Sequence, residues 1–282
     1  LLTSLRADGR SVLTVGRGAS SDIQWDPRLG RLDPATLADV DAVVHLAGSP
    51  VGERWTEERK REIRESRVRS TRLLAQTVAG LSATARGPRV LVCASAIGFY
   101  GSRGDEWLDE TSASGSDFLA GVVRDWETAA DPARSASVRV VHVRAGVVLS
   151  PHGGALAKML PPFRLGAGGR LGDGRQWMSW ISLDGLVRTM RFALDTPGRV
   201  GPVNAVSPEP VTNTEFTAVL SRQLGRPAIA RIPAFVLHAL YGEMAEATLL
   251  ASQRARPARL LQAGFAFAHA PLEAALRFEF AR

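Results

Sequence analysis

The stretch CASAIGFYGSRGDE, residues 93–106, continues the apolar run RVLVCAS (residues 89–95) into a turn of small residues. An apolar run of this length, bounded by turn-forming residues, is typical of a strand buried inside a parallel sheet. Similar runs occur before and after it, and amphipathic segments separate them. The sequence therefore predicts an α/β fold in which helices cover both faces of a parallel, Rossmann-type sheet.

The same patterns, followed outward from this stretch, predict the order of the elements. Residues 1–10 have the apolar spacing of a helix end that is closed by Gly9. The expected strands lie at residues 11–17, 22–26, 37–48, 89–95 and 138–150, and the expected long helices at residues 55–79 and 117–130. Residues 151–185 are rich in Gly and Pro, have little periodicity, and are interpreted as a long functional loop.

We expect two domains, a nucleotide-binding domain over residues 1–203 and a smaller C-terminal α+β domain over residues 204–282. The alternation of strands and helices stops near residue 200. In the stretch VTNTEFTAVLSRQLG, Thr212 or Asn213 is a suitable N-cap for a helix of the second domain.

The composition excludes several classes of function. The net charge is +7, and of 35 basic residues only Lys60 and Lys158 are lysines. The densest basic stretch, ERKREIRESRVRS (58–70), interleaves Glu with Arg at helical spacing, which favours a solvated helix face over a nucleic-acid-binding surface. The five histidines are scattered, so no metal site is predicted.

Cysteine content and hydropathy bear on the compartment and on partners. The single cysteine, Cys93, lies inside an apolar strand and is interpreted as a small core residue. A cytoplasmic protein is the default expectation, and no apolar run is long enough to span a bilayer. We expect a small-molecule substrate as the partner, neither nucleic acid nor membrane, with a homodimer as an open alternative to a monomer.

Several motifs occur in an order that resembles a known family. These are GR (16–17) at the end of the strand expected at residues 11–17, VVHLAG (43–48), SAIGFYG (95–101), RAGVVLSPHGGALAKMLPPFRLGAGG, GRQWMSWISLDGL and VSPEPVTNTEF. Together they resemble the NAD(P)-dependent epimerase/dehydratase family, within the extended short-chain dehydrogenases. More narrowly, they resemble its atypical branch with a C-terminal domain of unknown function, often labelled a nucleotide-sugar epimerase. The resemblance covers essentially the whole chain.

The chain departs from the family pattern at its start. Members begin with a strand and a Gly-x-x-Gly-x-x-Gly turn that places the cofactor pyrophosphate on a helix N-terminus. Residues 1–10 instead match the end of the helix that follows this turn. The resemblance therefore implies that the first strand and the glycine turn are missing from this sequence, and that the sequence as it stands binds the dinucleotide weakly.

A second departure concerns the Tyr-x-x-x-Lys pair that short-chain dehydrogenases use for proton transfer. Phe118 stands at the tyrosine position and Val122 at the lysine position, and neither side chain ionises. The serine is also displaced, because Ala96 occupies the place four residues before Tyr100 and Ser95 comes one residue earlier. The resemblance therefore does not bring the usual mechanism with it.

The resemblance implies a set of cofactor-binding residues. Arg17, after Gly16 at the end of the strand expected at residues 11–17, which corresponds to the second strand of the family, suits the 2′-phosphate of NADP, whereas an acidic residue there would favour NAD. The rest of the set is Leu46, Ala47, Gly48, Glu62, Arg67 and Val148. The alternatives are a surface arginine at 17, an ordinary turn at 46–48, a surface ion pair between Glu62 and Arg67, and a core valine at 148.

Ser95 and Tyr100 are the expected catalytic residues, because their hydroxyl groups are placed by the sequence at the mouth of the site. The substrate pocket is expected to include Arg175, Gln176 and Trp177, since aromatic walls with one amide suit a flat or sugar-like ligand. Each has a structural alternative: a pocket wall for Tyr100, a solvent-exposed arginine at 175 and core packing for tryptophan.

Two functions remain open. The first is an NADP-dependent oxidoreductase or epimerase acting on a small carbonyl or sugar-like substrate. The second is a non-catalytic NADP-binding or sensor protein, which the loss of the Tyr-x-x-x-Lys chemistry favours.

Overall fold

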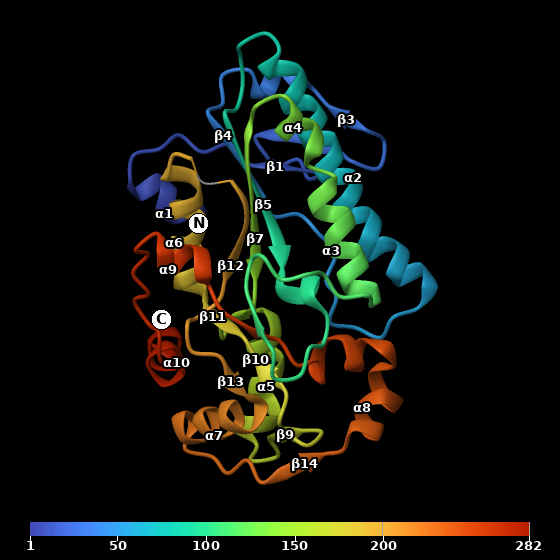
Figure 1. The fold of residues 1–282 in the computed structure, drawn as a ribbon, viewed down its shortest axis with the longest axis vertical. Coiled ribbons are helices and arrows are strands. Elements are labelled where there is room, and N and C mark those ends of the chain that lie inside the picture. Colours follow the sequence, from blue (N-terminus) through green and yellow to red (C-terminus); the bar gives the residue numbers. More distant parts are fainter. Residues whose placement is uncertain (199, 282) are drawn as a thin grey trace.

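The computed structural model describes residues 1–198 and 200–281 and contains a four-stranded parallel sheet (Figure 1). Its strands are β4 (Ala42–His45), β5 (Val90–Ala96), β7 (Arg139–Ala145) and β12 (Gly201–Ala205), in the order β12-β7-β5-β4. Every pairing between them is parallel, so their carboxyl ends meet at one edge of the sheet. The predicted α/β fold with a parallel sheet is confirmed.

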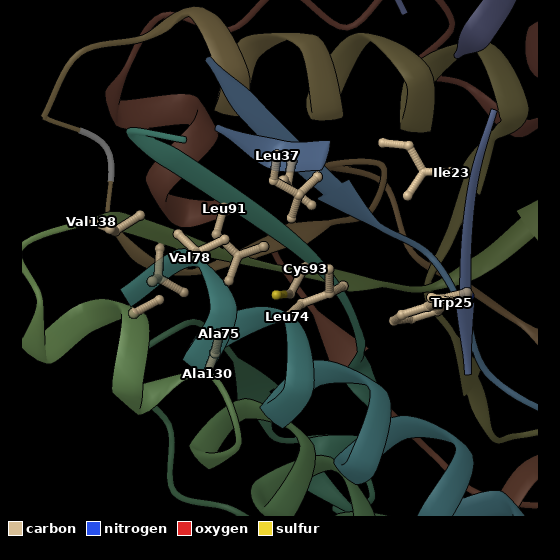
Figure 2. Packing of buried hydrophobic residues seen from close by; sticks show 13 residues of the cluster. Ile23, Trp25, Leu37, Leu74, Ala75, Val78, Leu91, Cys93, Ala130 and Val138 are labelled. Atoms are coloured by element: carbon tan, nitrogen blue, oxygen red, sulfur yellow. The ribbon is translucent and has the colours of Figure 1, made fainter. Parts of the chain in front are cut away.

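Helices cover both faces of this sheet. One face carries α2 (Glu57–Ser82), α3 (Phe118–Thr128) and α4 (Asp131–Ser135), and the other carries α6 (Leu183–Asp195) with α1 (Leu2–Ala7) beside it (Figure 1). The alternation of side chains along β5 explains this arrangement. Leu91 and Cys93 pack under α2, as Figure 2 shows, whereas Val92 packs in the cluster on the α6 side.

Strands β1 (Val15–Gly16), β2 (Ile23–Asp26) and β3 (Arg31–Leu32) form a separate small sheet. β1 is parallel to β2, and β3 returns antiparallel to β2. The strand expected at 11–17 is thus reduced to two residues, because the amide and hydroxyl of Thr14 donate to the Asp22 carboxylate, at 2.8 and 2.7 Å, in place of strand pairing. A short 3₁₀-helix (Pro34–Leu37), capped by Asp33, likewise replaces the start of the strand expected at 37–48.

The remaining elements include those that form a second core. They are β6 (Trp107–Leu108), β8 (Val147–Leu149), α5 (Gly154–Arg164), β9 (Gly169–Leu171), β10 (Trp177–Met178), β11 (Trp180–Ser182), β13 (Val211–Thr212), α7 (Asn213–Leu224), β14 (Ala230–Ile232), α8 (Ala234–Tyr241), β15 (Arg254–Ala255), α9 (Ala258–Gln262) and α10 (Leu272–Phe280). Five of these elements, namely β8, α5, β11, α7 and α10, supply the buried residues of the second core. A 3₁₀-helix (Ile97–Tyr100) follows β5, and a π-helix (Ala245–Leu249) follows α8. We call the unit formed by residues 147–182 and 206–281 the C-terminal unit.

The expectation of a long loop over residues 151–185 is wrong. This segment contains the helix α5 and three strands, and Leu156, Leu160 and Phe163 form a buried stripe at helical spacing. The glycines and the Pro161–Pro162 pair hid this stripe from the composition argument. The expected boundary between residues 203 and 204 falls inside β12, which ends at Ala205, and the division into two domains remains a prediction.

Candidate functional site

A cavity of about 860 Å³ lies between the small sheet, the loop after β4 and the exposed side of α2. We call it the α2 cavity. Its lining residues are Val15, Gly16, Arg17, Trp25, Pro27, Arg28, Ala47, Gly48, Ser49, Pro50, Glu58, Arg61, Glu62, Glu65, Ser66, Arg69 and Ser70. The carboxyl ends of β1, β2 and β4 all open onto it, which is where parallel α/β sheets bind their ligands.

The cavity brings together five of the eight expected cofactor-binding residues, namely Gly16, Arg17, Ala47, Gly48 and Glu62. These residues lie between positions 16 and 62 and come from three places in the fold: β1 and the residue after it, the loop after β4, and α2.

The other three expected cofactor-binding residues do not line the α2 cavity. Leu46 is half exposed at the end of β4. The Arg67 guanidinium lies beside Gly48, donates to the Ile63 carbonyl and stacks over the Trp126 ring. Val148 lies within β8, paired with Ile181 of β11, and packs against the core on the α6 side.

The cations of the cavity fall into two groups. Arg69 is paired with Glu65 at 3.1 Å. Within the described part of the chain, the side chains of Arg17, Arg28 and Arg61 make neither a hydrogen bond nor an ion pair. Three guanidinium groups therefore remain available to an anionic ligand.

The carboxylate of Glu62 is held in a fixed position. It accepts hydrogen bonds from the Ser49 hydroxyl at 2.8 Å and from Arg59 at 2.7 Å. The hydrogen bond from Ser49, followed by that from Arg59, lowers the pKa of Glu62, so the group is ionised at neutral pH. A fixed carboxylate of this kind accepts hydrogen bonds from ribose hydroxyls or an amino group.

The inner wall of the cavity consists of neutral polar groups. The Ser66 hydroxyl accepts from the Ser49 amide at 3.0 Å, and the Ser70 hydroxyl lies 3.0 Å from Nε2 of His45. Burial lowers the pKa of His45 to about 4, so its ring is neutral at physiological pH. The Trp25 indole packs edge-on against this ring.

Sequence reasoning missed most of the α2 contribution. The missed cavity residues on this helix are Glu58, Arg61, Glu65, Ser66, Arg69 and Ser70. Their spacing of three or four residues places them along one side of the helix, together with Glu62. That stripe was visible in the sequence, but its charges fit a solvated face equally well.

Ser95 and Tyr100 belong to a buried network of hydrogen bonds, and Tyr100 also borders a cavity. The Ser95 hydroxyl donates to Glu127 at 2.6 Å, and Arg144 forms two hydrogen bonds of 2.8 Å with the same carboxylate. The Tyr100 hydroxyl donates to Asn204 at 2.7 Å and accepts from Arg144 at 3.1 Å. We call these five residues the buried network.

The two hydroxyl groups are 5% and 0% exposed at the residue level. Ser95 therefore does not lie at the mouth of a site, because β5 turns its side chain inward toward Glu127 of α3, whereas Tyr100, in the 3₁₀-helix after β5, borders the cavity past the end of that strand. Burial raises the pKa of Tyr100 to about 12, which keeps the phenol protonated. Their participation in catalysis stays a prediction.

The positions that correspond to the missing Tyr-x-x-x-Lys pair have different surroundings. Phe118 packs edge-on against Trp55, and the Lys60 ammonium lies 5.3 Å from its ring centroid. Val122 is 1% exposed, so a lysine at this position would bury its charge. The helix α3 thus has an aromatic ring, Phe118, beside Trp55 and Lys60, and a buried apolar side chain, Val122, in the core.

The expected substrate residues are largely engaged in structural contacts. The Gln176 amide donates to the carbonyls of Leu171 and Leu249, at 3.2 and 3.0 Å, and is buried. The Trp177 indole donates to Asp105, and its ring stacks with Arg254. Arg175 is exposed.

A second cavity, of about 470 Å³, lies where the 3₁₀-helix after β5 meets the C-terminal unit. Its wall includes the predicted catalytic residue Tyr100, together with Gly101, Ser102, Arg103, Asp117, Glu243 and Glu246. Because it opens past the carboxyl end of β5, it is placed to hold a substrate close to a ligand of the sheet.

The described residues provide no other kind of centre. Residues 1–198 and 200–281 contain no group of three or more His, Cys, Asp or Glu side chains arranged to hold a metal ion. No helix within the same ranges combines the length and the apolar character that crossing a bilayer requires. Cys93 is buried, as predicted, and burial raises the pKa of its thiol to about 12.

Two family models match the chain. Residues 2–206 match the NAD dependent epimerase/dehydratase family, and residues 232–279 match a domain of unknown function (DUF1731). An epimerase family protein of Mycobacterium bovis is 44% identical over 282 residues, which are 99% of this chain and 92% of that protein. The mouse epimerase family protein SDR39U1 is 36% identical over 97% of this chain and 92% of its own length.

Solved structures agree with these sequence relationships. The human epimerase family protein SDR39U1, crystallised with NADPH, superposes with a TM-score of 0.89 at 34% identity, over 99% of this chain and 94% of that one. A nucleoside-diphosphate sugar epimerase of Corynebacterium glutamicum superposes with a TM-score of 0.79 at 38% identity, over 98% of this chain and 54% of that one.

Proposed function

Because the chain belongs to the NAD dependent epimerase/dehydratase family, we propose that it binds NADP(H) in the α2 cavity and acts as an oxidoreductase or epimerase. The substrate class that we propose is a small carbonyl or sugar-like compound. Such a compound fits the second cavity, whose wall is polar and lies beside the carboxyl end of β5.

The observation that carries the proposal is the convergence of Gly16, Arg17, Ala47, Gly48 and Glu62 on a single cavity. A volume of about 860 Å³ is within the usual range for cofactor-sized ligands. The human relative of the same fold was crystallised with NADPH, which supports a nicotinamide dinucleotide as the ligand.

The residues fit a 2′-phosphorylated dinucleotide better than NAD. Arg17 follows β1 directly and has no partner among the described residues, so its forked donors are free to bind a phosphate. An acidic residue at this position would instead accept from an unmodified ribose. The opposite wall supplies the fixed Glu62 carboxylate and the Ser66 and Ser70 hydroxyls.

When bound, the nicotinamide group supplies or accepts a hydride, and the chain must handle the accompanying proton. Neither Phe118 nor Val122 can do so. We therefore propose that the Tyr100 hydroxyl, whose residue borders the second cavity, exchanges this proton with the substrate, and that Ser95 holds the Glu127 carboxylate of the buried network in place.

The alternative function, a non-catalytic NADP-binding or sensor protein, is favoured by one observation. The groups that occupy the positions of the proton-transfer pair are an aromatic ring and a buried valine. Both functions share the same cofactor site. They differ in whether bound NADPH is consumed when carbonyl compounds are added.

Calorimetric titration with NADPH and NADH tests the cofactor assignment. Replacing Arg17 by Ala should weaken NADPH binding about tenfold or more, because a hydrogen bond to a charged group contributes about 1.5–3 kcal/mol. NADH binding should change little. Arg31→Ala, in β3 and outside the cavity, is the matched control. Equal loss of both cofactors in Arg17→Ala would contradict the assignment.

A further inference from the structure

The turn between β2 and β3 brings a second arginine to the α2 cavity. Asp26 ends β2, and its carboxylate accepts from the backbone amides of Arg28 and Leu29, at 2.8 and 3.2 Å. These two hydrogen bonds close the turn and set the direction in which the chain passes residue 28. The Arg28 side chain is left to line the cavity.

The topology of the small sheet explains why Arg17 and Arg28 meet. β1 and β2 are parallel and in register, with Val15 opposite Ile23 and Gly16 opposite Gln24. Their carboxyl ends therefore leave the sheet at the same edge, with β2 extending two residues further than β1. Arg17 is the first residue beyond β1, and Arg28 lies just beyond the end of β2, so the two arginines flank the same corner of the cavity.

The charges at this corner favour an added anion. Neither guanidinium has a hydrogen bond or an ion pair within the described residues. The positive charge of Arg28 reaches Glu62, but this carboxylate already accepts hydrogen bonds from Arg59 and Ser49. Two neighbouring cations without partners repel each other, and a phosphate placed between them would remove that repulsion and receive hydrogen bonds from both.

We propose that Arg28 is the second arm of an arginine clamp, formed with Arg17, that binds a phosphomonoester on the ribose of an adenosine nucleotide. The proposal rests on the proposed function, since it assigns the 2′-phosphate of NADP(H) to this clamp. Arg28 is then a specificity-determining residue that adds to the discrimination between NADP(H) and NAD(H).

Adenosine nucleotides that carry no pyrophosphate test the clamp, because their binding does not depend on the pyrophosphate-binding turn of the family. The 282-residue chain is titrated calorimetrically with 2′,5′-ADP, 3′,5′-ADP and 5′-AMP at low salt. The first carries the phosphate of NADP, the second that of coenzyme A, and the third has no ribose phosphomonoester. The variants are Arg17→Ala, Arg28→Ala, the double variant, Arg28→Lys and the control Arg31→Ala, which changes an arginine of the same hairpin outside the cavity.

We expect Arg28→Ala to weaken 2′,5′-ADP about tenfold and 5′-AMP less than about twofold, because one charge-assisted contact to the phosphate is lost. The double variant should bind 2′,5′-ADP and 5′-AMP equally, and Arg28→Lys should recover part of the loss. In the wild type the preference for 2′,5′-ADP should fall below about pH 6, where the phosphate loses its second charge. The Asp26 turn accepts from the backbone of residue 28, so Arg28→Ala keeps it and should melt like the wild type.

The outcomes separate the clamp from the function on which it rests. An unchanged preference for 2′,5′-ADP in Arg28→Ala, with a loss in Arg17→Ala, would overturn the role of Arg28 and leave the proposed function standing. Tighter binding of 3′,5′-ADP than of 2′,5′-ADP would overturn the assignment of the clamp to the 2′-phosphate. Failure of the wild type to bind any of the three nucleotides would overturn the proposed function itself.

Discussion

At the scale of single residues, the Arg144–Glu127 pair is a buried ion pair held by two hydrogen bonds. The two side chains are 4% and 13% exposed and share two hydrogen bonds. Burial alone would raise the pKa of Glu127, but the hydrogen bonds and charge of Arg144, together with Ser95 and the nearby His142, outweigh it and lower this pKa. The carboxylate is therefore ionised and depends on its partner.

Replacing Arg144 by Met should destabilise the protein by about 3–5 kcal/mol, because it leaves a buried carboxylate without its countercharge. The free energy of unfolding, measured by urea denaturation, checks this. The double variant Arg144→Met/Glu127→Met should recover much of the loss. A double variant less stable than Arg144→Met would show that the pair itself, rather than the orphaned charge, sets the energy.

The buried histidines predict how stability depends on pH. Burial lowers the pKa of His45 and His142 to about 4, whereas the unfolded value is near 6.5. The unfolded chain binds these protons first, so stability is fully present above about pH 6.5 and is lost as the pH falls toward 4. The protonation of each histidine should lower the free energy of unfolding by up to about 3 kcal/mol over this range.

Urea denaturation at several pH values checks this dependence. His45→Gln should flatten the decline between pH 6.5 and 4, whereas the control His152→Gln, at an exposed position, should not. An equal slope in wild type and His45→Gln would contradict the assignment of this dependence to His45.

The cavity residues that were predicted correctly from the sequence are mainly those whose place follows from the end of a strand alone. Gly16, Arg17, Ala47 and Gly48 end strands, and parallel strands end at a common edge. Ser95 lies near the end of β5 and Tyr100 ends the 3₁₀-helix that follows, but the partners of their side chains are Glu127 and Asn204, which are far away in sequence. Arg28 escaped sequence reasoning because its place depends on a turn closed by Asp26.

At the scale of elements, a break in the chain direction between β7 and β8 separates the main sheet from the two-stranded sheet formed by β8 and β11. Gly146 separates the two strands, and a Cβ at this position would lie 2.9 Å from Val206 and 3.0 Å from the Ser179 carbonyl carbon. Val147 donates to the Ser179 carbonyl at 2.8 Å, so the chain cannot move away without losing this hydrogen bond. The glycine allows β7 to stay in the main sheet while β8 joins β11.

Gly146→Ala should therefore cost about 1–3 kcal/mol of unfolding free energy through overpacking. Thermal and urea denaturation give the value. Gly153→Ala is the control, because a Cβ there meets no atom within 4 Å and the backbone is extended. A similar small loss in both variants would argue against the close approach at Gly146.

The strands and helices of the nucleotide-binding half could be predicted, since apolar runs and amphipathic stripes alternate there. The C-terminal unit was harder to predict because its strands have two or three residues and pair over long distances, as β14 does with β9 and β15 with β6. Such short strands have no periodicity that a sequence pattern can show.

At the scale of the whole molecule, three contacts join the loop after β4 and the start of α2 to the C-terminal unit. Lys60 forms an ion pair with Glu243, Lys158 donates to the Gly52 carbonyl at 2.9 Å, and Arg54 donates to the Ala239 carbonyl at 2.8 Å. Both lysines of the chain thus lie at this junction. The contacts tie the loop after β4 and the start of α2 to α5, α8 and the residues after α8.

Lys60→Met should loosen this junction with little change in global stability, because Glu243 is half exposed and exposed pairs contribute about 1 kcal/mol or less. Hydrogen–deuterium exchange should show faster exchange of the amides in residues 46–56. Arg72→Met, at an exposed position further along α2, is the control. Unchanged exchange at 46–56 in Lys60→Met would mean that this ion pair does not hold the loop.

The parallel sheet with its covering helices could be predicted from the order of the elements. The second core could not, because its residues come from segments before and after the last strand of the main sheet. The second core contains Leu149 and Trp180, which precede the last strand of the main sheet, and Leu276 near the end of the chain. The chain therefore crosses between the two units more than once. The division of the chain into two domains near residue 203 stays a prediction.

The central claim is that the α2 cavity binds the adenosine half of NADP, and a crystal structure of the chain soaked with NADP tests it most directly. The account predicts electron density for the adenosine between Trp25 and the Ser66–Ser70 side of α2, with the 2′-phosphate between Arg17 and Arg28. Density for the nucleotide at another place on the molecule, or with the 2′-phosphate turned away from both arginines, would contradict the claim.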